Sequence, residues 1–201
     1  FNADEDGWAI VALAKLPADM VIYFTENEWN GADPGVGGAF NSGEAVYTWS
    51  LGSEAVSEGQ VVRFSGVNRA ADRSASVGSL TASGTANLAG GGDGLFAYLG
   101  ADGDTPSVFL AAVSNDGFSG GQLDGTGLVL GASAIALESG TRFGEYAGVR
   151  SGAADFSSYA VAVNDVAGWS TSKLNSAATV PNLSTFTVAA AVPEPESYAM
   201  M

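Results

Sequence analysis

The side chains of this chain that could take part in chemistry are almost all carboxylates. The 201 residues include 22 Asp and Glu but no His and no Cys. Without these two residue types, a Ser-His-Asp triad, a Cys-His nucleophile and the usual zinc hydrolase site are excluded. No glycine-rich stretch ends in Gly-Lys-Ser or Gly-Lys-Thr, the pattern that surrounds phosphates. Carboxylate catalysis, cation binding and a non-enzymatic role therefore remain.

Glu26 and Glu28 form a carboxylate pair whose spacing could suit acid–base catalysis. On an extended chain, alternate side chains share a face and lie roughly 7 Å apart. Glycosidases use two carboxyl groups at about that separation. The sequence gives no sign of the cleft that would raise the pKa of one of them, and glutamates are mostly exposed. We therefore expect two solvated carboxylates, no catalytic residues and no enzymatic activity.

Two acidic turns are candidates for binding a hard cation. Asp4 and Asp6 lie in an Asp-Glu-Asp-Gly turn, and Asp102 and Asp104 lie in an Asp-Gly-Asp turn. Calcium takes six to eight oxygen ligands, and glycine lets backbone carbonyls turn inward. Neither turn matches the twelve-residue EF-hand loop or the nonapeptide calcium repeat. Calcium is thus the only cofactor indicated, and ordinary Asp-Gly turn chemistry is the alternative.

Aromatic side chains offer a possible platform for stacking sugars. The alternative is packing in the core and on sheet faces, where aromatic residues of alternating strands usually lie. We favour core packing for the five candidates, which are Tyr23, Trp29, Tyr47, Trp49 and Tyr98.

Composition predicts one all-β domain. Hydrophobic residues make up 46% of the chain and charged residues only 14%, and 28 glycines separate short apolar runs. A chain of this length buries roughly 70% of its unfolded surface. With 7 basic residues and a net charge of −15, binding to nucleic acid is disfavoured, because that binding depends on clustered Lys and Arg.

Apolar runs between turn residues predict about ten strands, the pattern of a sandwich. In residues 45–50 alternation places Tyr47 and Trp49 on one face. Two short helices are also predicted, at residues 153–158 and at residues 165–169 with Asn164 as the cap. The predicted strands are residues 8–13, 20–25, 45–50, 60–65, 94–99, 108–113, 128–130, 134–137, 159–163 and 185–191.

The C-terminal residues resemble a sorting signal. Pro193, Glu194 and Pro195 form a triplet that can be neither helix nor central strand, because each proline fixes φ and removes a donor. The triplet resembles the start of a PEP-CTERM signal, in which a membrane helix and a basic cluster follow. That resemblance implies export by a Gram-negative bacterium, processing by an exosortase-type enzyme, and a place at the cell surface or in extracellular matrix.

The body of the chain resembles a module of exported bacterial proteins and, distantly, lamin-tail-like sandwiches. The resemblance covers most of residues 1–150 and implies an Ig-like or lamin-tail-like β-sandwich. We predict one sandwich domain at residues 1–191, followed by a sorting-type tail at residues 192–201. Proteins with this module share no agreed activity. The stretches that carry it are residues 1–8, 23–29, 40–49, 56–62 and 92–98.

The last apolar run suggests self-assembly. An open sandwich has edge strands that pair readily with other chains unless charges or prolines protect them. An uncharged alternating segment before the tail, and the opening segment at Phe1, could add to the sheet of a neighbour. We therefore predict a structural protein that forms filaments or matrix with itself. The alternative is a surface module that binds exopolysaccharide or calcium. The residues predicted to add as a strand are Thr185, Phe186, Thr187, Val188 and Ala189.

Overall fold

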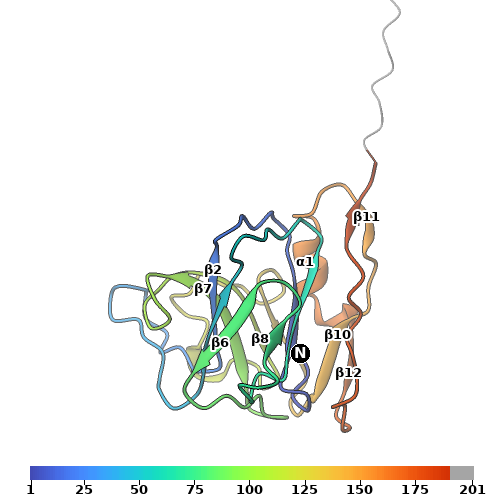
Figure 1. The fold of residues 1–201 in the computed structure, drawn as a ribbon. Helices are drawn as coiled ribbons and strands as arrows, with labels where there is room; N and C mark the ends of the chain where they lie inside the picture. The colour runs from blue at the N-terminus through green and yellow to red at the C-terminus, as the bar shows by residue number, and fades with distance from the viewer. Residues whose placement is uncertain (191–201) are drawn as a thin grey trace, which may run out of the picture.

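The protein is an all-β sandwich, as the sequence predicts. The structure is a computed structural model that describes residues 1–190. It contains thirteen strands and one α-helix, and Figure 1 shows the sheets standing side by side with the C-terminal strands at one edge. No described helix has the length and apolar character needed to cross a bilayer.

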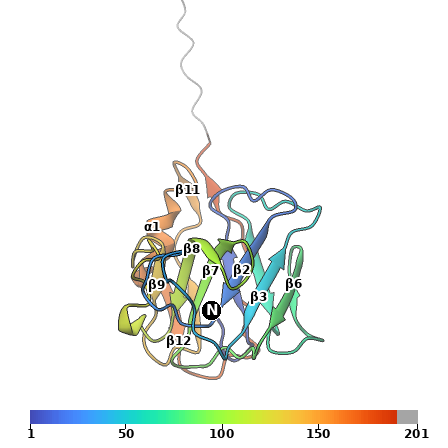
Figure 2. The same ribbon diagram turned by 90° about the vertical axis from the view of Figure 1, so that its left-hand side faces the viewer.

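The larger layer is a six-stranded sheet that Figure 2 shows nearly face-on. All neighbouring strands run antiparallel except the last pair, β8 and β9, which are parallel. The predicted hairpin at residues 100–106 joins β7 to β8. In spatial order the strands are β6 (Ser79–Ser83), β3 (Val46–Ser50), β2 (Val21–Thr25), β7 (Gly94–Gly100), β8 (Pro106–Ser114) and β9 (Ala134–Ala136).

A three-stranded sheet covers part of one face of the larger sheet. Its order is β1 (Trp8–Val11), β4 (Val61–Ser65) and β5 (Ser74–Ala75). β1 runs antiparallel to β4, with Trp8 opposite Phe64 and Val11 opposite Val61. β1 therefore forms one edge of this sheet.

The C-terminal third adds two strand pairs and the helix. β10 (Phe143–Tyr146) pairs antiparallel with β12 (Trp169–Ser172). β11 (Ser151–Ala153) pairs in parallel with β13 (Thr187–Val188). The helix α1 (Tyr159–Asn164) lies between these pairs and the six-stranded sheet (Figure 1). Two 3₁₀ turns complete the secondary structure, η1 (Ser119–Gly121) and η2 (Val166–Gly168).

Aromatic packing forms two cores, one on each face of the larger sheet. Trp8 from β1 packs against Phe24, Tyr47 and Phe64, with ring centroids 5.0–5.2 Å apart. On the opposite face, loops at residues 26–44 and 115–130 cover a second cluster. Its fully or nearly buried members are Trp29, Phe96, Tyr98, Phe109, Ala112, Phe118, Leu128 and Ala134.

The structure corrects several predicted elements. Residues 159–163, predicted as a strand, are the helix α1, because a short apolar run suits a buried strand and a helix equally well. Residues 153–158, predicted as a helix, end β11 and continue as a turn. Residues 128–130 contribute only an isolated bridge at Leu130. The second predicted helix, at residues 165–169, contains the 3₁₀ turn η2, and its N-cap is Asp165 instead of the predicted Asn164. Five strands were not predicted, namely β5, β6, β10, β11 and β12.

Candidate functional site

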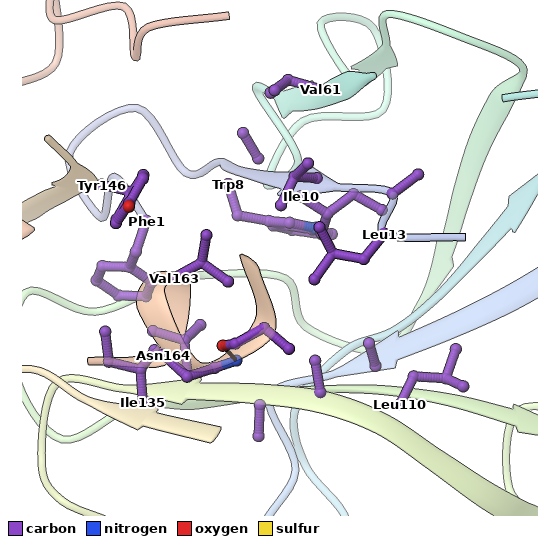
Figure 3. Close-up of a pocket in the computed structure, with 18 of the residues that line it drawn as sticks. Phe1, Trp8, Ile10, Leu13, Val61, Leu110, Ile135, Tyr146, Val163 and Asn164 are labelled. Carbon is purple, nitrogen blue, oxygen red and sulfur yellow. Dashed lines mark hydrogen bonds between the residues drawn. The ribbon is translucent and has the colours of Figure 1, made fainter. Parts of the chain in front are cut away.

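An apolar groove of about 510 Å³ lies between the two layers. β1 forms one wall, β8 and β9 form the floor, and α1 and β10 form the other wall (Figure 3). The side chains that line it are mainly aliphatic and small. Those labelled in Figure 3 include Ile10, Leu13, Leu110, Ile135 and Val163.

The β1 wall has a free strand edge. In an antiparallel ladder the backbone groups of alternate residues point to the two sides. Ala12 N donates to Gln60 O at 3.0 Å, so the even-numbered residues of β1 bond toward β4. The N–H and C=O groups of Ala9 and Val11 therefore point away from β4. Within residues 1–190 no hydrogen bond engages these groups, although both residues line the groove.

The first two residues occupy the start of the space beside β1. Asn2 and Gly7 exchange both backbone hydrogen bonds, at 2.8 and 3.0 Å, so Phe1 and Asn2 run antiparallel to β1. Gly7 must lack a side chain, because a Cβ there would lie 2.5 Å from Phe64 O. Phe1 is buried in the core, and the chain lies in the position of a strand next to β1.

β10 flanks the same two residues on their other side. Asn2 also bridges antiparallel to Phe143, and Phe1 and Gly144 exchange hydrogen bonds at 2.9 and 3.0 Å. Phe1 and Asn2 thus connect the three-stranded sheet to β10 and β12. Because both flanking strands are antiparallel to this segment, β1 and β10 run parallel to each other.

No strand among residues 1–190 continues Phe1 into the space between β1 and β10, and this is where the groove lies. We call it the open strand position. Residues 9–11 of β1 bound it on one side, residues 145–146 of β10 on the other, and Phe1 closes one end. Tyr146 N–H has no hydrogen-bond partner among the described residues, whereas Tyr146 O accepts from Arg150 Nη2 at 2.9 Å. Arg150, which also lines the groove, therefore lies at the Tyr146 end.

Trp8 contributes a further unpaired donor to this wall. Its side chain is only 3% exposed and lines the groove (Figure 3). Its indole Nε1 is buried and has no hydrogen-bond partner among residues 1–190. A buried donor without an acceptor costs about 1–3 kcal/mol, so an occupant that brings an acceptor to this nitrogen is favoured.

Comparison of the chain with models of known families, with curated proteins and with solved structures gives no match. The chemistry of the site therefore has to be derived from its own geometry.

The predicted donor segment is part of the fold that the structure describes. Phe186 is 2% exposed and packs on Tyr159 and Tyr146, and Arg150 lies over its ring at 4.9 Å. Its backbone N–H donates to Gly59 O at 2.8 Å. Phe186 and Ala189 flank the two residues of β13, Thr187 and Val188, whose ladder with β11 has two residue pairs, and Thr185 is exposed just before Phe186. The motif Pro193, Glu194 and Pro195 lies outside the described residues.

The predicted calcium residues do not converge. Asp4 forms an ion pair with Arg142 and accepts from Ser176 N at 2.7 Å, which lowers its pKa. Asp6 accepts from Leu88 N at 3.0 Å. Asp102 accepts from the backbone of Asp104, as in an ordinary Asx turn. Among residues 1–190 no three acidic side chains form a metal-binding group.

The two glutamates of the candidate catalytic pair lie in different environments. β2 ends at Thr25, so the extended spacing assumed for Glu26 and Glu28 does not apply. Glu26 is buried and accepts from the Tyr47 hydroxyl and from Asn87 N, whereas Glu28 is exposed and bonds Asn41. The prediction that both are solvated is wrong for Glu26, and neither residue lines a described hollow.

Most of the aromatic residues considered for sugar stacking lie in the interior, in agreement with the predicted core packing. Trp29, Trp49, Tyr47 and Tyr98 are each at most 2% exposed, and Tyr23 is half-buried. The sequence did not indicate the site that the structure presents, whose main groups are backbone atoms of Ala9, Val11 and Tyr146. The apolar pattern at residues 8–13 predicted a strand, but such a pattern does not show which edge of the strand is unpaired.

Proposed function

We propose that this protein is an exported, non-enzymatic building block that assembles with itself by β-strand addition. The observation that carries the proposal is a pair of uncharged edge strands among residues 1–190, namely β1, which lines the apolar groove, and β13, which pairs with β11 through two residue pairs. Free strand edges are templates for pairing with another chain. In strand addition, backbone hydrogen bonds supply affinity and side-chain pockets supply specificity.

The surroundings of β1 support this role. Exposed edges are usually protected by lysine, proline or a bulge, but β1 consists of Trp, Ala, Ile and Val, and its register with β4 is regular. The sorting-type tail, Pro193 to Pro195, supports an extracellular place for the assembly and an exosortase-type enzyme as a processing partner. Filaments or matrix are the expected products, since contacts between different surfaces of two copies need not close.

The decisive variant is Val11→Pro. Proline removes a backbone N–H that points away from β4, so the ladder with β4 loses no hydrogen bond. We expect the assembled fraction of purified protein to fall at least tenfold, measured by light scattering after size exclusion and by electron microscopy. The apparent melting temperature should change by only a few degrees.

Val11→Ala is the matched control, because it shortens the same side chain but keeps the N–H. We expect it to assemble like the unaltered protein. If Val11→Pro folds and assembles as well as Val11→Ala, the β1 edge is not the contact and the proposal fails. Failure of the unaltered protein to assemble over a wide concentration range would also contradict it.

A further inference from the structure

We infer that the loop between β6 and β7, residues 84–93, is a pH-sensitive latch that is closed at mildly acidic pH and opens locally when the carboxyl group of Glu26 ionises. We call residues 84–93 the latch. Its opening belongs to the single folded chain, so it does not depend on the proposed assembly.

Three consecutive backbone N–H groups of the latch each bond a different carboxyl group. In chain order, residues 87–89 donate to Glu26 Oε2 at 3.3 Å, to Asp6 Oδ1 at 3.0 Å and to Asp93 Oδ2. These carboxyl groups come from the turn before β1, from the end of β2 and from the start of β7. In the part of the chain that the structure describes, residues 84–92 form no backbone–backbone hydrogen bond. Side-chain carboxyl groups therefore hold the latch where a ladder would hold a strand.

The latch carries one apolar anchor between two glycine hinges. Leu88 is 2% exposed and belongs to the core that contains Trp8 and Tyr47. Gly84 has φ of 81° and Gly92 has φ of 94°, values that glycine adopts at little cost. A Cβ at Gly92 would meet no atom within 4 Å, so this hinge is unpacked. The latch can therefore move away while β6 and β7 stay in their sheet, and Leu88 then leaves the core.

The charged groups around the latch do not neutralise Glu26. Arg69 pairs with Asp72, Arg142 pairs with Asp4, and Arg73 Nε donates to a backbone carbonyl. Among residues 1–190 no lysine or arginine forms an ion pair with Glu26. Besides the groups that bond or repel Glu26 directly, the charged side chains that act on the latch and its carboxyl groups are Asp4, Glu28, Arg69, Arg73 and Arg142.

Ionisation of Glu26 opposes the closed latch. Burial raises the pKa of this carboxyl group from 4.5 to about 7, and repulsion from Asp93 and Glu44 adds to the rise, whereas bonds from Tyr47 and Asn87 lower it. In the open latch the group is solvated, and its pKa returns toward its ordinary value. The closed state thus binds more protons than the open state between these two values. The free energy of opening therefore falls as pH rises from about 4.5 to about 7.

Amide hydrogen exchange followed by NMR tests this device. Each measured rate is compared with the intrinsic rate at the same pH, which gives a protection factor at pH 5 and at pH 8. We expect the protection of residues 87–89 to fall about tenfold or more between the two. At both pH values it should lie below the protection of the amides that pair β2 with β7. Equal protection of latch and sheet would mean that the latch opens only when the whole fold does, and would overturn the inference.

Glu26→Gln is the decisive variant, and Glu28→Gln is the matched control. Both replace a glutamate by its amide, but Glu28 is exposed and bonds Asn41, outside the latch. We expect the fall in protection of residues 87–89 to be nearly abolished in Glu26→Gln and unchanged in Glu28→Gln. An equal fall in the two variants would show that Glu26 does not operate the latch.

Asp93→Asn is made in parallel, in case Glu26→Gln does not fold. The amide keeps an oxygen for Ala89 N–H but removes a negative charge that repels Glu26. The Glu26 carboxyl group should then ionise at lower pH in the closed latch, so we expect a smaller fall in protection that is complete at a lower pH. A pH profile of protection identical to that of the unaltered protein would contradict the inference.

Discussion

At the scale of single residues, the least expected feature is the carboxyl group of Glu26. Burial raises its pKa to about 7, although bonds from Tyr47 and Asn87 N–H act in the opposite direction. Repulsion from Asp93 and Glu44 adds to the rise. Asp93 and Glu44 also have a raised pKa, mainly through burial. The Glu26 carboxyl group therefore titrates near neutral pH although it lies in the interior.

Glu26 should make stability depend on pH between about 4.5 and 7. The folded state favours the protonated form, so the free energy of unfolding falls as pH rises from the unfolded pKa of 4.5 through the folded value of about 7. A difference of one between the folded and unfolded pKa corresponds to about 1.4 kcal/mol. The free energy of unfolding should therefore fall by about 3 kcal/mol across this pH range. Urea unfolding at pH 5 and pH 8 measures it.

Glu26→Gln is the variant that isolates this group. The amide stays uncharged, so we expect the loss between pH 5 and pH 8 to shrink by more than half. The amide also cannot accept from both Tyr47 and Asn87, so the variant should be about 1 kcal/mol less stable at pH 5. An unchanged pH dependence would show that another group is responsible.

At the scale of elements, the C-terminal strands depend on one aromatic side chain. β13 has two paired residues, too few to hold a strand alone, and Phe186 beside it packs between Tyr146 and Tyr159. The Tyr159 hydroxyl also donates to Thr187 O at 2.7 Å. Helix α1, which carries Tyr159, is thus the element that positions β13.

Truncation of Phe186 should be strongly destabilising. Phe186→Ala removes a buried ring, and such changes cost about 3–5 kcal/mol. Leu174→Ala, at a side chain that is 78% exposed, should change stability by less than about 0.5 kcal/mol. Guanidinium unfolding of both variants checks the contrast, and equal effects would mean that β13 is not anchored by this contact.

The strands found from sequence are those with long apolar or alternating runs. Residues 46–50 are an example, because burial of Tyr47 and Trp49 alternates with their half-buried neighbours as predicted. β10 was missed because Phe-Gly-Glu-Tyr has no such run. The open strand position could not be predicted, because it depends on Asn2 meeting Phe143, and no local pattern encodes a pairing of residues so far apart.

At the scale of the whole molecule, charge opposes association. The net charge is −15 on 201 residues, so copies repel one another at low ionic strength. The open strand position lies among apolar residues and backbone groups, which leaves its attraction little affected by salt. Salt should therefore decide whether charge repulsion or strand pairing dominates. The distance over which charges interact falls from about 30 Å at 0.01 M salt to about 8 Å at 0.15 M.

Added salt should promote assembly. We expect the concentration at which half of the protein assembles to fall several-fold between 10 and 150 mM sodium chloride, since repulsion is screened and strand pairing is not. Calcium chloride at equal ionic strength is the control. A much larger effect of calcium at matched ionic strength would indicate specific binding of the cation, for which the candidates are Asp4, Asp6, Asp102 and Asp104. Among residues 1–190 these do not form a group of three acidic ligands.

An acceptor at the β1 edge would give any resulting fibre a polarity. Strand addition at β1 would be a contact between different surfaces of two copies, so every subunit of a fibre built by it would point the same way. One tip of the fibre would then expose an empty acceptor and the other a free donor. Val11→Pro, whose β1 edge is blocked but whose donor is intact, would cap the tip that exposes an empty acceptor, so a substoichiometric amount should slow growth at that tip without dissolving fibres already formed.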